Sequence, residues 1–172
     1  MNINNFIKNN NLEKSYIIGY YGGTNFGDEL LLEVLLNLMK ERKIKEVSFY
    51  YSDKKNYSKY HKDFGYTLAP AKPLQILKKI ITSNNIIIGG GGLWGLDFNR
   101  NIAILSTLLF IAKFFLRKKI YLIGVGYYNS LPKDGYFFAK IASKSADLIF
   151  ARDDESFSNF NKHNKKCYLV PD

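Results

Sequence analysis

Cysteine, histidine and long apolar runs are scarce in this chain of 172 residues. Its single cysteine, Cys167, excludes an internal disulfide framework and fits a reducing cytoplasm. We expect Cys167 to be a half-buried strand residue rather than a nucleophile. The two histidines, His61 and His163, do not lie in a metal-ligand pattern, so no metal site is expected.

No run of about 20 apolar residues occurs, so a membrane-spanning helix is not expected. Residues 1–11 are rich in Asn and lack the apolar region of a signal peptide. The longest apolar stretch, 102–116, contains Lys113 and is followed by the basic residues 117–119. Two interpretations stay open for it. It is either a helix that covers a sheet and whose basic end suits the helix dipole, or an interfacial helix that contacts a membrane surface.

Acidic residues are in the minority, with 15 Asp and Glu against 25 Lys and Arg, which gives a net charge of +10. Such a charge attracts anionic partners, although the sequence is rich in Lys throughout and the excess also reflects composition alone. The lysines are scattered and no nucleic-acid-binding motif is present, so nucleic acid is not an expected partner. The anionic surface of a membrane is the better candidate.

The most informative segment is 16–29, where a short apolar run leads through a glycine-rich turn into an acidic pair and a helical pattern. This order predicts a strand, a loop that a ligand can approach closely and a helix N-terminus. Gly22 and Gly27 have the spacing of the first half of a Walker A loop, but Asp28 and Glu29 replace its lysine and hydroxyl residue. The dinucleotide fingerprint G-x-G-x-x-G is also absent. The segment therefore does not indicate an NTPase or a dinucleotide-binding enzyme.

Asp28 has a structural interpretation, in which it caps a helix expected over 29–42 and favours the positive end of that helix. Capping does not explain why Asn25 and Asp28 lie together beside Gly22 and Gly23, where side chains leave a gap. A polar, hydroxyl-rich ligand fits this combination better than a bare phosphate does.

Predicted strands and helices alternate along the chain with short connections. We expect strands at 15–20, 46–51, 66–69, 85–88, 119–123, 147–151 and 167–170, and helices at 29–42, 73–82, 100–116, 134–145 and 154–161. This alternation predicts an α/β fold with a doubly wound, mostly parallel sheet of Rossmann-like type. Residues 1–14 are expected to form a flexible N-terminal segment and 15–172 the Rossmann-like domain.

Glycine-rich signals follow several predicted strands, at the edge where the carboxyl ends of parallel strands meet and ligands bind. The run of four glycines at 89–92 follows the fourth strand. We expect Gly90, Gly91, Gly126 and the adjacent Tyr127 to approach a substrate, and the glycine amides to suit an anion. The alternative is that the glycines only allow a sharp exit from a crowded sheet.

Two further candidates, Trp94 and Asp97, come directly after the glycine run and are expected to pack on and hydrogen-bond to a sugar-like ring. Arg152 follows the sixth strand, where its guanidinium offers a planar fork to a carboxylate or phosphate. An ion pair of Arg152 with a nearby acid is an equally good interpretation. The acids at 153–155 are expected to cap the next helix rather than to catalyse. Together these turns predict one common rim that carries Asn25, Trp94, Tyr127 and Arg152.

The motifs at these turns resemble those of the polysaccharide pyruvyl transferase family. Five short pieces match in the family's order and spacing, and they cover nearly the whole chain and the N-terminal half of a family member. They are Gly19-Tyr20-Tyr21-Gly22 with Asn25-x-Gly27-Asp28-Glu29, Ile88-Gly89-Gly90-Gly91-Gly92-Leu93, Gly124-Val125-Gly126, Arg152-Asp153-x-x-Ser156, and Val170-Pro171-Asp172.

The resemblance implies two Rossmann-like domains that face a cleft, as in glycosyltransferase-B enzymes. It also implies transfer of a pyruvyl group from phosphoenolpyruvate to a sugar of a lipid-linked or cell-surface glycan. No cofactor is implied, since phosphoenolpyruvate is the donor substrate. This N-terminal domain would hold the acceptor, with Asn25 and Asp28 on its hydroxyls and Asp28 as base, while Arg152 neutralises the donor. Much of the donor site is expected from a C-terminal domain, so we expect little turnover by this chain alone.

Two other functions stay open: a non-catalytic module that binds a glycan or a membrane surface, and half of a nucleotide-sugar glycosyltransferase. The expected partners are a sugar or glycan acceptor, the inner face of a membrane contacted peripherally, and either a second copy or a chain that supplies the other domain.

Overall fold

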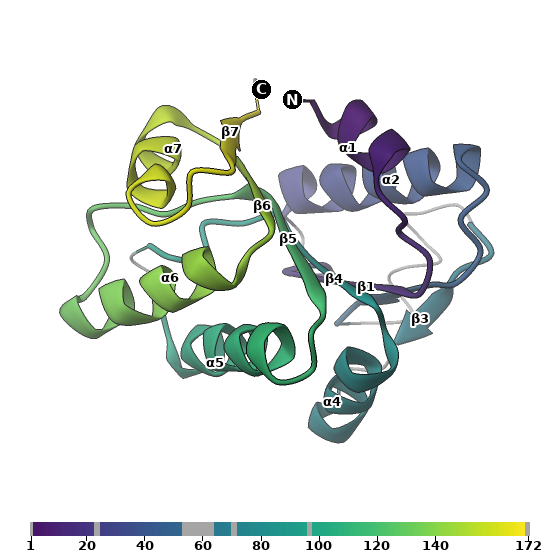
Figure 1. Ribbon diagram of the computed structural model, residues 1–172, viewed down its shortest axis with the longest axis horizontal. Helices are drawn as coiled ribbons and strands as arrows, with labels where there is room; N and C mark the ends of the chain where they lie inside the picture. The colour runs from purple at the N-terminus through teal and green to yellow at the C-terminus, as the bar shows by residue number, and fades with distance from the viewer. Residues whose placement is uncertain (1, 23–24, 53–63, 70–71, 96–97, 171–172) are drawn as a thin grey trace. The chain divides into compact units, whose positions relative to one another are not determined.

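The computed structural model describes residues 2–22, 25–52, 64–69, 72–95 and 98–170 (Figure 1). The chain divides into two compact units, Met1–Gly89 and Gly90–Asp172. We describe each unit by itself.

The first unit holds four parallel strands in the order β3-β2-β1-β4. Figure 1 shows α1 and α2 on one side of β1 and β4, and α4 on the other. Its elements are α1 (Ile3–Asn9), β1 (Ser15–Gly19), α2 (Phe26–Glu41), β2 (Val47–Tyr50), β3 (Thr67–Ala69), α4 (Pro73–Thr82) and β4 (Asn85–Gly89).

The second unit holds three parallel strands in the order β5-β6-β7. Each of these strands follows a helix, and Asn99 begins the first of those helices by accepting the N–H groups of Asn101 and Ile102. The elements are α5 (Arg100–Phe114), β5 (Lys119–Val125), α6 (Lys133–Ser145), β6 (Leu148–Ala151), α7 (Asp154–Asn161) and β7 (Cys167–Leu169).

Seven parallel strands alternating with helices confirm the predicted α/β, Rossmann-like class. The central strands read as continuous apolar runs because both of their faces are covered. In β4, Ile86, Ile87 and Ile88 have no exposed surface, and the same holds for Leu122 and Ile123 of β5. No helix within the described ranges is long and apolar enough to cross a membrane.

Helix α1 is an element that the sequence analysis did not predict. It begins at the cap residue Asn2, whose side chain accepts the N–H of Asn5. The helix buries Phe6 and Ile7 completely or nearly so. A helix of seven residues is too short to be stable alone, so these two buried side chains hold it in place.

Candidate functional site

The strand order reverses in the first unit, between β1 and β4. β1 pairs with β2 on one side and with β4 on the other, and its last residue, Gly19, lies opposite Gly89. In open α/β sheets the crevice at the carboxyl ends of two such strands is the usual place for a ligand. This end of the first unit is called the switch point below.

The ring of Tyr21 fills the space that the two glycines at the switch point leave. A Cβ atom on Gly19 would strike the carbonyl oxygen of Gly89 and the Tyr21 ring, and one on Gly89 would strike the Tyr21 hydroxyl. Tyr21 is 1% exposed. The close approach that the glycines allow is therefore made by a residue of the chain itself.

The hydroxyl of Tyr21 is buried and has no hydrogen-bond partner in the part of the chain that the structure describes. Burial raises the pKa of Tyr21, and the charges of Asp28 and Glu29 raise it further. The hydroxyl is therefore a protonated donor close to two carboxylates. A buried hydroxyl without a partner destabilises a fold by about 1–3 kcal/mol, which makes this group an unusual feature of the switch point.

Helix α2 begins at Phe26, and its cap residue is Asn25. The Asn25 side-chain oxygen accepts the N–H of Gly27 at 3.2 Å, and its amide group donates to Oδ2 of Asp28 at 2.9 Å. The expectation that the helix starts after Asp28, with Asp28 as its cap, is therefore wrong. Asp28 lies inside the first turn because Asn25, three residues earlier, caps the helix by accepting one of its free N–H groups, that of Gly27.

Exposure differs sharply between these two side chains. Asp28 is 5% exposed, whereas Asn25 is exposed. The Asn25 amide therefore lies at the surface, with the Asp28 carboxylate behind it. An exposed amide backed by a buried carboxylate is suited to binding and orienting a hydroxyl group.

The loop between β1 and α2 is fixed at Gly22. The N–H of Gly22 donates to Oε1 of Glu29 at 2.6 Å, and its φ of +83° is one that glycine adopts without strain. A Cβ atom there would also strike the Ser52 hydroxyl, and the N–H of Ser52 donates to the carbonyl oxygen of Tyr21 at 3.1 Å. Glu29 therefore organises this loop.

In the second unit, the residues after β4 run beside the end of β5. Three backbone hydrogen bonds join them. The N–H of Gly126 donates to the carbonyl oxygen of Gly91 at 3.0 Å, the N–H of Trp94 to that of Gly126 at 3.2 Å, and the N–H of Tyr128 to that of Trp94 at 2.8 Å. The N–H of Gly90 donates to Ile123 at 3.0 Å, so this amide is engaged within the protein. The glycine run thus continues the hydrogen bonding of the sheet beyond the named strands.

Residues 90–95 and 126–128 are called the loop cluster below. Tyr128 is a central residue of this loop cluster, and the sequence analysis did not select it as a candidate. Cβ atoms placed on Gly92, Gly95 and Gly126 would lie within 3.1 Å of its ring. Its hydroxyl donates to Oδ2 of Asp153 at 2.9 Å. Burial raises the pKa of Tyr128, and the bond to Asp153 adds to this shift.

Trp94 and Tyr127 lie in the core of the second unit, with 0% and 3% of their surface exposed. The Trp94 indole donates to the hydroxyl of Ser106 at 3.2 Å and packs edge-on against Phe160. Tyr127 donates its backbone N–H to Ser156 at 2.9 Å. Both rings are held by the protein itself, which fits a structural role better than direct contact with a sugar.

Arg152 lies at the end of β6, and its side chain is 48% exposed. Its Nε is 3.6 Å from Oδ2 of Asp153, so the alternative of an ion pair with a neighbouring acid is realised at this distance. The contact is too long for a hydrogen bond, and within the described residues the guanidinium makes none. Arg152 therefore remains able to bind an anion.

Asp153 caps α7, as expected, by accepting the N–H of Ser156 at 2.8 Å. Burial alone would raise the pKa of Asp153. Hydrogen bonds from Ser156 and Tyr128, together with the charge of Arg152, outweigh burial and lower this pKa. An ionised, fully engaged carboxylate of this kind supports the loop and is a poor general base.

A model of the family described as polysaccharide pyruvyl transferase matches residues 25–172. The chain belongs to this family. No curated protein matches the chain. The matched region begins at Asn25 and so includes the Asn25–Asp28 pair and the loop cluster of the second unit.

The first pyruvyl transferase motif lies in the first unit, the glycine run at 88–93 crosses the boundary at Gly90, and the remaining motifs lie in the second unit. The predicted common rim would join Asn25 of the first unit to Trp94, Tyr127 and Arg152 of the second, and it remains a prediction. The candidates Gly23 and Asp97 lie outside the described residues.

Two further kinds of reactive group bear on the chemistry of this member of the family, namely candidate metal ligands and the Cys167 thiol. Within the described ranges, no three or more of its His, Cys, Asp and Glu residues are placed to hold a metal ion. Cys167 is buried in β7, where burial raises its pKa to about 11. Such a thiol is a weak nucleophile near neutral pH.

Proposed function

We propose that this chain is the acceptor-side domain of an enzyme that transfers a pyruvyl group from phosphoenolpyruvate to a sugar of a cell-surface or lipid-linked glycan. Membership of the family supports the reaction class. The observation that carries the assignment of the acceptor side is the Asn25–Asp28 pair at the switch point, where an exposed amide is held at 2.9 Å by a buried carboxylate.

In this proposal the Asn25 amide donates a hydrogen bond to one acceptor hydroxyl, and the Asp28 carboxylate beside it accepts the proton of that hydroxyl directly and passes it on to the methylene carbon of the donor. The hydroxyl oxygen adds to the central carbon of phosphoenolpyruvate, whose methylene carbon takes up a proton. A second hydroxyl of the sugar then displaces the phosphate, which leaves with the remaining proton, and a ketal results. Both protons come from the two hydroxyl groups, so atoms and charge balance.

Arg152 is the proposed contact for the donor. Phosphoenolpyruvate carries a carboxylate and a phosphate, and a half-exposed guanidinium without a hydrogen bond can bind either group in two-pronged fashion. Asp153 pairs with Arg152 only at 3.6 Å and also accepts hydrogen bonds from Ser156 and Tyr128, so an anionic ligand can bind the guanidinium at shorter distance than Asp153 does.

The donor role is tested by titrating this chain with phosphoenolpyruvate and measuring its affinity by calorimetry. We expect Arg152→Ala to weaken binding about tenfold or more, since a hydrogen bond to a charged group contributes about 1.5–3 kcal/mol. Arg117→Ala removes the same charge from an exposed residue of the same unit and serves as the control. Equal affinities for wild type and Arg152→Ala would exclude the role.

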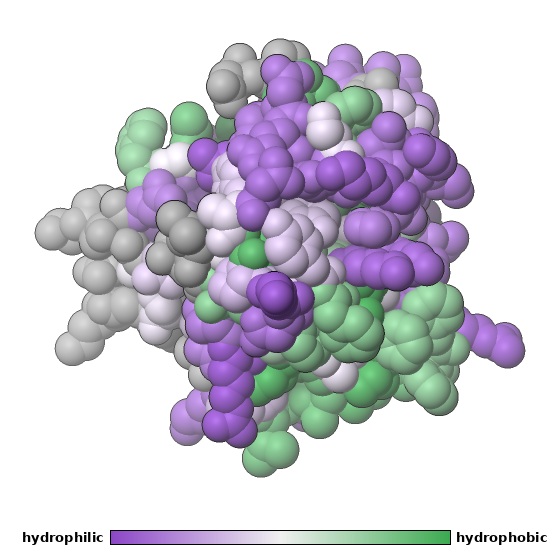
Figure 2. All heavy atoms as spheres, turned by 90° about the vertical axis from the view of Figure 1, so that its left-hand side faces the viewer, coloured by the Kyte–Doolittle hydropathy of each residue, from purple (hydrophilic) through white to green (hydrophobic). Residues whose placement is uncertain are grey.

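A second candidate function, binding to a membrane surface, is favoured by the end of α5. Phe114 and Phe115 are 54% and 74% exposed, and the basic residues 117–119 follow after Leu116. On the face drawn in Figure 2, apolar residues gather in one region beside hydrophilic ones. Exposed aromatic rings next to cations are typical of interfacial helices.

This candidate is tested by sedimentation with vesicles that contain or lack anionic lipid. We expect Phe115→Ser to reduce binding to the anionic vesicles, with Leu74→Ser of α4, which is 81% exposed, as the matched control. Binding that is absent, or unchanged in Phe115→Ser, would reject the membrane role and would leave the pyruvyl transferase proposal untouched.

A further inference from the structure

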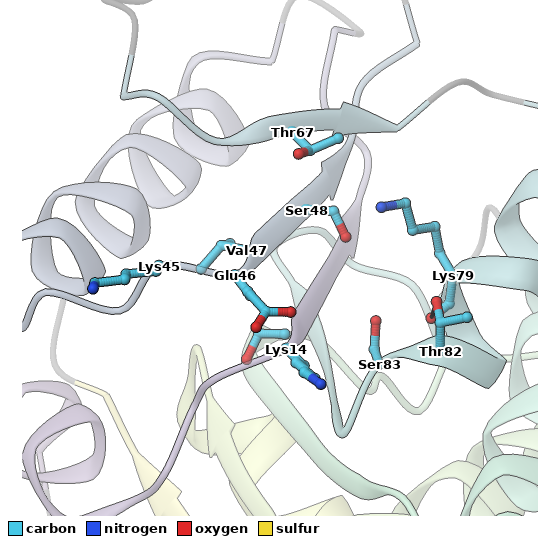
Figure 3. A pocket seen from close by; sticks show the side chains of 10 residues that line it. Lys14, Lys45, Glu46, Val47, Ser48, Thr67, Lys79, Thr82 and Ser83 are labelled. Atoms are coloured by element: carbon cyan, nitrogen blue, oxygen red, sulfur yellow. Dashed lines mark hydrogen bonds between the residues drawn. The ribbon is translucent and has the colours of Figure 1, made fainter.

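A pocket of about 440 Å³ opens at the amino-terminal edge of the first unit's sheet, the edge opposite the switch point. Figure 3 shows its wall, which is formed by the beginnings of β1, β2 and β3 and by the carboxyl end of α4. Its volume falls in the range of roughly 300–1,000 Å³ that is usual for small-molecule sites. The proposed pyruvyl transfer makes no use of this pocket.

Two serine hydroxyls that line the pocket lack partners. Ser48 and Ser83 are 4% and 5% exposed, and within the described residues neither side chain makes a hydrogen bond. In Figure 3 both oxygen atoms point into the hollow. By contrast, the hydroxyls of Ser15 and Thr82, which also line the pocket, donate to the carbonyl oxygens of Leu12 and Lys78. Neither serine oxygen is sealed from the hollow, so a molecule bound in the pocket can hydrogen-bond to both of them.

The pocket also presents two lysines, Lys14 and Lys79, that form no ion pair with the described residues. Lys79 is half-buried, and its ammonium group points across the hollow toward Ser48 and Thr67 (Figure 3). Lys14 lies at the rim, and in the described part of the chain neither lysine forms an ion pair. Lys45 points away from the hollow, and Glu46 is the one acid among the lining residues. The side chains that face the hollow therefore favour a negatively charged ligand.

The backbone of Lys14 is held in place. Its φ is +57°, a left-handed conformation that destabilises a residue with a side chain, and its carbonyl oxygen accepts the N–H of Asn84 at 2.8 Å. The carboxylate of Glu46 and the pocket hydroxyls can also accept hydrogen bonds from a ligand. A ligand that carries both an anionic group and hydroxyls would therefore satisfy more of this wall than inorganic phosphate would.

We propose that this pocket binds a small phosphorylated polyol, of which a hexose phosphate is the simplest example. Its phosphate lies between Lys79, Lys14 and the hydroxyls of Ser48 and Ser83, and its own hydroxyls face Glu46 and Thr67. The proposal does not depend on pyruvyl transfer, because no residue of the pocket is shared with the switch point or with the loop cluster of the second unit.

The test is a titration of the whole chain with glucose 6-phosphate, followed by two-dimensional amide NMR, with glucose and inorganic phosphate as separate arms. We expect saturable shifts around the pocket with glucose 6-phosphate, weaker binding of phosphate at the same amides and none with glucose. Glucose that binds as tightly as its phosphate, or an absence of saturable shifts, would overturn the proposal.

A matched pair of variants on α4 tests the cation. Lys79→Met retains the aliphatic stem and should weaken binding about tenfold or more, while Lys78→Met, on an exposed neighbour outside the pocket, should change it less than about twofold. Equal weakening in both would show general charge attraction only and would refute the site.

The variant Ser48→Ala distinguishes a role of this hydroxyl in ligand binding from a role in the stability of the fold. Because the hydroxyl makes no hydrogen bond among the described residues, its removal should weaken glucose 6-phosphate binding several-fold and leave the melting temperature unchanged or slightly raised. A lowered melting temperature with unchanged affinity would assign Ser48 to the fold and would count against the proposal. Arg152→Ala should leave this binding unchanged, which distinguishes the pocket from the proposed donor site.

Discussion

Each of the two units uses a tyrosine ring to fill the space that its glycines leave, but the units treat the tyrosine hydroxyl differently. In the second unit, Tyr128 packs against three glycines and donates to Asp153 at 2.9 Å. In the first unit, Tyr21 packs against Gly19 and Gly89, and its buried hydroxyl has no partner within the described residues.

The two units therefore differ in whether the polar groups around the tyrosine are hydrogen-bonded within the described chain. The polar groups around Tyr128 bind one another, so that loop cluster is stable without a ligand. The switch point of the first unit retains a buried hydroxyl donor near two acids, and this donor has no partner in the described part of the chain. Glycine-rich sequence alone therefore does not distinguish a ligand site from a packing site.

The largest effect is expected from adding a methyl group to the glycines. Gly19→Ala should destabilise the fold by about 2 kcal/mol or more, because its Cβ would strike the backbone oxygen of Gly89, which cannot move aside. Gly126→Ala should destabilise less, because the half-buried Tyr128 side chain can shift. Gly27→Ala has its nearest neighbour at 3.7 Å and is the control, with an effect near zero. Urea unfolding measures the free energy of unfolding of all three variants. Equal losses of stability in Gly19→Ala and Gly126→Ala would contradict the distinction between a rigid backbone neighbour and a movable side chain.

Replacing tyrosine by phenylalanine should change the free energy of unfolding in opposite directions at Tyr128 and Tyr21. Tyr128→Phe removes a hydrogen bond to a carboxylate and should lower the free energy of unfolding by about 1 kcal/mol or slightly more. Tyr21→Phe removes an unpartnered group and should leave stability unchanged or raise it by up to about 1 kcal/mol. The comparison of the units would fail if Tyr21→Phe were the more damaging change.

The smallest effect is a pH dependence from Asp153. Its pKa is lowered in the folded state, so it stabilises the fold above the pKa of the unfolded chain, about 4, and this contribution is lost as the pH falls through the folded-state value. Asp153→Asn retains a good helix cap but loses the charge, so its stability should fall less steeply than that of wild type below about pH 4. Unfolding curves at several acidic pH values give the slopes. Parallel slopes would show that other carboxylates dominate.

Sequence patterns were sufficient for the fold because strands such as β4 are apolar along their whole length and helices such as α4 begin with a proline. The start of α2 was misplaced because Asn25 and Asp28 are both good cap residues, and periodicity alone cannot choose between them. α1 was missed because it depends on the burial of Phe6 and Ile7 rather than on local signals.

The site was harder to predict than the fold because contacts between distant residues decide it. Trp94 follows a glycine run and carries no sequence mark of burial, yet Ser106 and Phe160 hold its ring in the core. Likewise, no local signal places Tyr21 against Gly89, which is far along the chain. A tyrosine near several glycines in a loop is the one clue that would have pointed to these ring contacts.

The pairing of β1 with β4 has a consequence for the order of assembly. Tyr16 of β1 lies opposite Ser48 of β2 but also opposite Ile86 of β4, which leaves the ribosome much later. The β1–α2–β2 crossover unit can form early, whereas closing the longer loop to β4 is slower. Until Gly89 arrives, the Tyr21 ring lacks one of its packing neighbours, so the switch point is complete only once the fourth strand has docked.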